Sequence, residues 1–95
     1  MRQISAFIDR NGNKQWGTPD ICSSRKISEG TYLIEFQQPF SQNPVATATI
    51  YGSPWQTFNI SVAIIEVSPY HCIYLTSTPD RPVDCGTMVM IMGEE

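Results

Sequence analysis

The chain has 95 residues and a formal net charge of −3, with 16% charged, 41% hydrophobic and 11% aromatic residues. A chain of this length has room for one modest core, so we expect a single domain over residues 1–95. The composition is too apolar for disorder and too evenly spread for a transmembrane segment, so we expect no membrane insertion. The acidic balance also argues against nucleic acid as a partner.

The cysteines favour a reducing compartment. Cys22, Cys72 and Cys85 are odd in number and form no CxxC pair, which fits reduced thiols better than a disulfide framework. Few apolar residues separate Met1 from Asp9, so the sequence shows no secretion signal. We therefore expect a cytoplasmic protein, or a virion protein if the chain is encoded by a phage.

The N-terminal part predicts short strands joined by tight turns. Ile4 to Asp9 forms a first strand, Asn11-Gly12 is typical of a hairpin turn, and Lys14-Gln15-Trp16 returns. The two faces of Ile21 to Ile27 differ little in polarity, which indicates an edge strand.

The centre of the chain predicts two strands around which we expect the others to assemble. Thr31 to Gln37 alternates between apolar and polar residues, the pattern of a half-buried strand. Pro39 and Pro44 lack amide donors, so they end one ladder before Val45 to Tyr51 begins the next.

The longest predicted strand runs from Thr57 to Val67, and Trp55 lies in the turn before it. Ile64 and Ile65 break its alternation, which indicates a bulge or a strand end buried on both sides. The predicted core residues share the inward faces of the strands and are Tyr32, Ile34, Phe36, Phe58, Ile60 and Val62.

The last two strands, His71 to Ser77 and Gly86 to Met92, are expected to pair as an antiparallel hairpin. Both faces of the final strand are apolar, with Met88, Met90 and Met92 on one side and Thr87, Val89 and Ile91 on the other. One core explains only one face, so we expect self-association into a dimer or trimer through whichever face is left exposed, with the three methionines as the candidate interface. The alternative is that the loop from Thr78 to Asp84 covers the second face.

These patterns together predict an all-β, antiparallel two-sheet sandwich of six to eight strands. No stretch has helical spacing for more than about two turns, so we expect essentially no α-helix.

The residues predict no enzyme, metal or cofactor. His71 and Cys72 are adjacent, and neighbours on a strand point to opposite faces, so they cannot form a nucleophile pair. One histidine and three scattered cysteines lack the close spacing of zinc ligands. Glu35 and Glu66 are interpreted as isolated acids that face water.

One loop-borne set remains as a weak candidate ligand site. Its rings could stack on a sugar or peptide while its polar groups donate and accept hydrogen bonds. The alternative interpretation is ordinary surface loops. The set consists of Trp55, Tyr70, His71, Asp80 and Arg81.

The order of the motifs resembles a small domain found at the ends of phage tail fibres and in uncharacterised bacterial proteins. The matching elements are Asp9-Arg10-Asn11-Gly12, Gly30 to Phe36, Pro39-Phe40, Pro44 to Thr49, and Asp84 to Gly93. Thr87 and Val89, or Met88 and Met90, stand where that family has its closing phenylalanines.

The resemblance implies a sandwich of the fibre-tip and H-type lectin-like kind, often trimeric. It implies a non-enzymatic module that recognises a cell-surface glycan or assembles as an oligomer. Two other classes stay open: a small mobile-element protein, and an immunity or inhibitor protein that acts by binding another protein.

Overall fold

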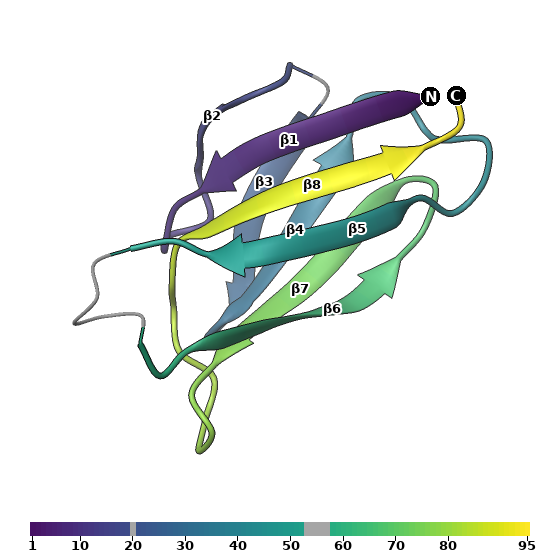
Figure 1. The fold of residues 1–95 in the computed structure, drawn as a ribbon. Coiled ribbons are helices and arrows are strands. Elements are labelled where there is room, and N and C mark those ends of the chain that lie inside the picture. The colour runs from purple at the N-terminus through teal and green to yellow at the C-terminus, as the bar shows by residue number, and fades with distance from the viewer. Residues whose placement is uncertain (20, 53–57) are drawn as a thin grey trace.

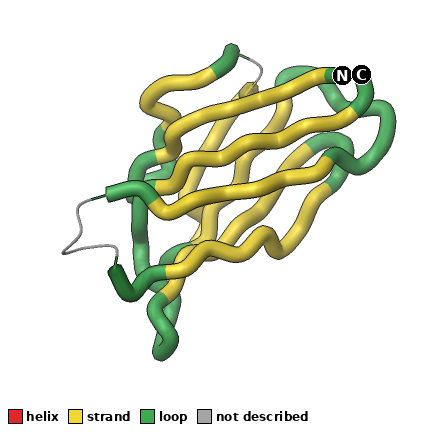
Figure 2. The backbone as a smooth tube through the Cα atoms, in the orientation of Figure 1, coloured by secondary structure: helices red, strands yellow, loops and turns green. Residues whose placement is uncertain are grey.

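A computed structural model describes residues 1–19, 21–52 and 58–95, which form eight β-strands and no helix (Figures 1 and 2). The strands are β1 Arg2–Ile8, β2 Lys14–Gly17, β3 Ile21–Ser28, β4 Thr31–Phe36, β5 Val45–Ile50, β6 Ser61–Val67, β7 His71–Ser77 and β8 Thr87–Gly93. They form two antiparallel four-stranded sheets. The first sheet has the order β2-β1-β8-β5 and the second β3-β4-β7-β6. The predicted all-β sandwich is confirmed.

The core fills the space between the sheets because alternate residues of the long strands point inward. Full burial of each large apolar side chain contributes roughly 1.5–3 kcal/mol. The predicted core positions Tyr32, Ile34 and Phe36 are buried. The largest fully buried apolar side chains are Tyr32, Tyr74, Ile4, Ile8, Ile34 and Ile91.

The predicted Asn-Gly hairpin joins β1 to β2. The Asp9 carboxylate accepts hydrogen bonds from the amides of Asn11 and Asn13, both at 2.9 Å. Gly12 has φ of 92°, and a Cβ there would collide with the backbone of Arg25 and Lys26. Glycine is therefore required both for the turn and for its close approach to β3.

The two strands predicted to form a central pair lie in different sheets. β4 belongs to the second sheet and β5 to the first, so the corner between Pro39 and Pro44 carries the chain across the sandwich. Phe40 anchors this corner, because its ring is buried and packs edge-on against Phe36, with 5.2 Å between the two ring centroids.

The predicted hairpin between the last two strands is wrong. β7 pairs with β4 and β6, whereas β8 pairs with β1 and β5. The segment after Ser77 first folds back, with a bridge from Ser77 to Pro82 and an amide of Val83 bonded to the Thr76 carbonyl. The chain then crosses to the first sheet, where the backbone of β8 forms hydrogen bonds with β1 on one side and β5 on the other.

The predicted strand from Thr57 to Val67 is too long, because β6 begins only at Ser61. Phe58 lies in a turn and is 85% exposed, so its assignment to the core is wrong. Ile60 is half-buried, and Val62 packs against the core from a partly buried position. The bulge is confirmed, since the register with β7 shifts between Ile64 and Glu66.

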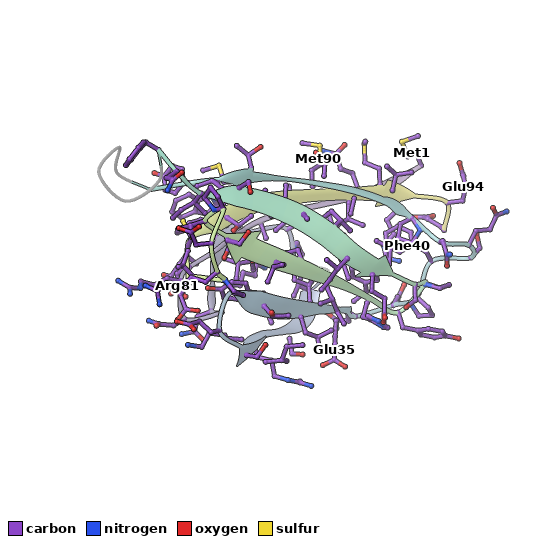
Figure 3. The ribbon with its side chains drawn as sticks, turned by 90° about the horizontal axis from the view of Figure 1, so that it is seen from below. Met1, Glu35, Phe40, Arg81, Met90 and Glu94 are labelled. Atoms are coloured by element: carbon purple, nitrogen blue, oxygen red, sulfur yellow. The ribbon has the colours of Figure 1, made fainter. Side chains whose placement is uncertain are left out.

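The two faces of β8 are now distinguished. Thr87, Val89 and Ile91 point into the core, and Met88 and Met90 point outward. β3 lies at the edge of the second sheet, as predicted. Figure 3 shows Met90 and Glu35 projecting from opposite faces of the sandwich.

Candidate functional site

Of the five residues predicted as a ligand site, the four that the structure describes do not come together as a group. His71 begins β7 and Tyr70 lies in the turn just before it, whereas Asp80 and Arg81 lie in the loop that follows this strand. A strand of 7 residues spans about 20 Å at the usual rise. Trp55 lies outside the described residues. The predicted set is therefore divided between two ends of the sandwich, with Arg81 at one of them (Figure 3).

His71 belongs to a polar cluster on the outer face of the second sheet. Its Nε2 lies 2.5 Å from a carboxylate oxygen of Glu66, and its Nδ1 lies 3.0 Å from Oγ of Ser68. Glu35, opposite His71 on β4, accepts a hydrogen bond from Ser23 at 2.6 Å. Both acids face water, as predicted, but they are not isolated: Glu35 is paired with residues of β3, and Glu66 is paired with His71 of β7.

The charge on Glu35 is favoured by its neighbours. The Ser23 hydrogen bond and the Arg25 guanidinium, 3.2 Å away, together lower the pKa of Glu35 below its ordinary value. The Glu35 carboxylate is therefore negatively charged at neutral pH and forms an ion pair with Arg25 on this face of the sandwich.

Ser68, His71 and Glu66 have the residue types of a hydrolytic triad, but the serine is already engaged. Its Oγ accepts hydrogen bonds from the amides of Tyr70 and His71, both at 3.1 Å. Those bonds build the turn between β6 and β7, and they occupy the lone pairs that a nucleophile needs. The arrangement accounts for a stable turn.

Polar contacts, from buried to exposed, fix the loops at the opposite end of the sandwich. The Tyr32 hydroxyl donates to the Arg10 carbonyl at 2.7 Å and accepts from the Cys85 amide at 3.1 Å. The Asp84 carboxylate accepts from Lys26 at 2.7 Å and from the Gly30 amide at 2.8 Å. These bonds tie three connecting segments together.

A cleft of about 400 Å³ lies among these loops. It combines exposed rings with groups that can donate or accept hydrogen bonds, a mixture suited to a small polar ligand. The lining residues that bear on recognition are Arg10, Tyr51, Phe58, Asn59, Thr78 and Asp84.

The cross-strand rows on the outer face of the first sheet contain no charged residue, while Lys14, at the bulge of β2, donates to the carbonyl of Thr18. The residues of this face lie in three cross-strand rows that the registers of β1, β2, β5 and β8 define. We call these rows the uncharged face: Trp16, Phe7, Met88 and Thr49; Ser5, Met90 and Thr47; Gln3, Met92 and Val45.

Aromatic rings gather at one end of the uncharged face. The centroid of the Phe7 ring lies 4.5 Å from that of Trp16 and 4.9 Å from that of Tyr51, and the centroids of Trp16 and Tyr51 are 6.2 Å apart. Gly86 allows this approach, since a Cβ there would come within 3.1 Å of the Phe7 ring. Beside Trp16, a shallow groove of about 260 Å³ runs past Thr47, Thr49, Met88 and Met90. Sequence reasoning identified only the methionines of this surface.

Comparison with known families and with curated proteins finds no match to this chain. The resemblance to fibre-tip domains therefore stays a prediction.

No helix of the described residues is long and apolar enough to cross a membrane. Nor do those residues contain a group of three histidine, cysteine, aspartate or glutamate side chains that could hold a metal ion.

Proposed function

We propose that this chain is a non-enzymatic binding domain that takes a protein partner on its uncharged face. The observation that carries the proposal is the exposure of large apolar side chains there: Trp16 is 53% exposed, Val45 69%, Met88 37% and Met90 38%. Burying such surfaces against a partner is favourable by about 25 cal/mol per Å².

The composition of the uncharged face supports a protein as the partner. Protein interfaces are enriched in aromatic residues and methionine and depleted of lysine, aspartate and glutamate in their centres. Methionine side chains are flexible and polarizable, so they adapt to an apolar partner surface. Contiguous exposed apolar patches are uncommon on chains that act alone.

The state of the reactive groups supports a role without catalysis. Burial raises the pKa of the Cys72 thiol to about 11, which leaves little of the nucleophilic thiolate at neutral pH. Cys85 is also buried, and burial raises the pKa of its thiol. Ser68 is held in a turn, as described above.

Co-purification tests the proposal with a matched pair of variants. Met90→Glu places a charge at the centre of the uncharged face. Leu33→Glu makes the same change on a central strand of the second sheet, where Leu33 is half-buried opposite Arg25. We expect one identifiable protein, which can be a differently tagged copy of this chain, to bind the parent and Leu33→Glu but not Met90→Glu. Equal recovery with all three would contradict the proposal.

A second candidate function is glycan recognition in the cleft among the loops. The supporting observation is that Phe58 and Tyr51, which are 85% and 46% exposed, flank the polar groups of Arg10 and Asp84 there. Exposed rings can stack on sugar faces while fixed polar groups orient the hydroxyls. On a glycan array, Phe58→Ala should abolish binding that Met90→Glu leaves unchanged, and a parent that binds no glycan would rule this function out.

A further inference from the structure

We propose that the partner of the uncharged face is a second copy of this chain, stacked face to face about a twofold axis. This inference rests on the proposed function and names its partner. In such a dimer each copy contributes the same patch, so the patch must tolerate contact with itself.

The absence of charge makes the uncharged face compatible with itself. When a face that carries charges stacks on its own copy, the charges must be desolvated, and like charges brought together repel each other. The outer face of the second sheet would meet this cost, because it holds the ion pair Arg25–Glu35 and the carboxylate of Glu66 beside His71. The uncharged face has no such group, so its apolar rows can be buried without removing an ion from water.

The shape of the surface fits a stacked pair of sheets. Aligned sheets pack about 10 Å apart, with side chains of one filling gaps in the other. Here Trp16 stands beside the groove lined by Thr47, Thr49 and Met90, so one copy offers both a large ring and a depression. In a twofold-symmetric contact each copy presents the same patch, so the ring and the depression of each copy both face the partner.

The area predicts how tightly the copies associate. β1 and β8 have 7 residues each, so the face measures about 23 Å along its strands and about 19 Å across four of them. Each copy would bury roughly 400–500 Å², so the pair would bury about 800–1,000 Å², which is below the range of stable complexes and within that of weak, transient ones. We therefore expect a reversible dimer that dissociates on dilution.

Sedimentation equilibrium of the purified chain, from about 5 µM to about 500 µM, tests the inference because this range brackets weak dimers. The parent and Leu33→Glu should show a mass that rises from monomer to dimer. Met90→Glu should raise the dissociation constant at least about tenfold. Thr47→Glu, at an exposed position of the same row, should do the same without removing any apolar side chain.

The outcomes separate this inference from the proposed function. A parent that stays monomeric over the whole range overturns the second copy as partner, as does a dimer that both Met90→Glu and Thr47→Glu leave intact. If the parent is monomeric but retains another protein that Met90→Glu loses, the proposed function stands and only the identity of the partner is wrong. If neither Met90→Glu nor Thr47→Glu weakens either association, both proposals fail.

Discussion

At the residue scale, two stacked tyrosines in the core have hydroxyls in different situations. The rings of Tyr32 and Tyr74 lie 5.2 Å apart and both side chains are fully buried. The Tyr32 hydroxyl bonds to Arg10 and Cys85, whereas the Tyr74 hydroxyl lies near the side chain of Thr87 but makes no hydrogen bond of normal geometry among the described residues. Burial raises the pKa of Tyr32 to about 12, so its hydroxyl stays protonated and can donate.

This contrast predicts opposite results from one chemical change. Tyr32→Phe leaves the Cys85 amide and the Arg10 carbonyl without their partner, so the free energy of unfolding should fall by about 1–3 kcal/mol. Tyr74→Phe removes a hydroxyl that makes no hydrogen bond of normal geometry, so stability should stay within about 0.5 kcal/mol of the parent or rise. Urea unfolding of both variants checks this, and an equal loss in both would contradict the assigned bonds.

Asp84 predicts a pH dependence of stability. Burial alone would raise its pKa, but the hydrogen bonds from Lys26 and the Gly30 amide outweigh burial and hold the pKa of Asp84 below its ordinary value. A carboxyl with a depressed folded pKa stabilises the fold above its unfolded pKa of about 3.9. That stability is lost as the pH falls through the folded pKa.

Asp84→Asn should therefore lower the free energy of unfolding near pH 7, so that the variant unfolds at a lower denaturant concentration than the parent. It should also lose less of its remaining stability than the parent between about pH 5 and about pH 2. Asp80→Asn makes the same charge change in the same loop, at an exposed side chain, and should alter neither quantity. Denaturant unfolding as a function of pH measures both. If Asp84→Asn loses stability in acid as steeply as the parent, this role of the carboxylate is wrong.

At the element scale, alternation predicted the strands well and their partners poorly. The pattern of β4 identified three core residues, because a period of two fixes which side chains share a face. Pairing depends on residues far apart in the chain: β7 and β8 follow each other, yet each finds its neighbours elsewhere. Trp16 and Val45 lie beside the methionines only because strands far apart in the chain pair in these registers, so the sequence alone did not reveal this surface.

Two phenylalanines test how the elements are bounded. Phe36 ends β4 with its ring buried against Phe40, so Phe36→Ala should cost about 3–5 kcal/mol of unfolding free energy. Phe58 shares the apparent alternation of β6 but lies in the turn before it, so Phe58→Ala should change stability by less than about 0.5 kcal/mol. Thermal and urea unfolding measure both changes, and a large loss at Phe58 would place its ring back in the core.

At the scale of the whole molecule, the sandwich has two unlike outer surfaces. The second sheet carries the ion pair Arg25–Glu35 and the polar cluster around His71, while the first carries rows of methionine, aromatic and hydroxyl side chains. A chain that acted alone would gain nothing from leaving Trp16 and Met90 in water. This asymmetry is the basis for assigning partner binding to the first sheet.

Methyl NMR of the parent chain tests that assignment most directly, because the sequence supplies a reporter for each face. Met88, Met90 and Met92 lie on β8 of the uncharged face, and Leu33 and Leu75, the leucines of this chain, lie on strands of the second sheet. Between about 10 µM and about 1 mM, we expect the signals of Met88 and Met90 to shift with concentration while both leucine signals stay fixed. Leucine signals that shift while the methionine signals do not would contradict the account.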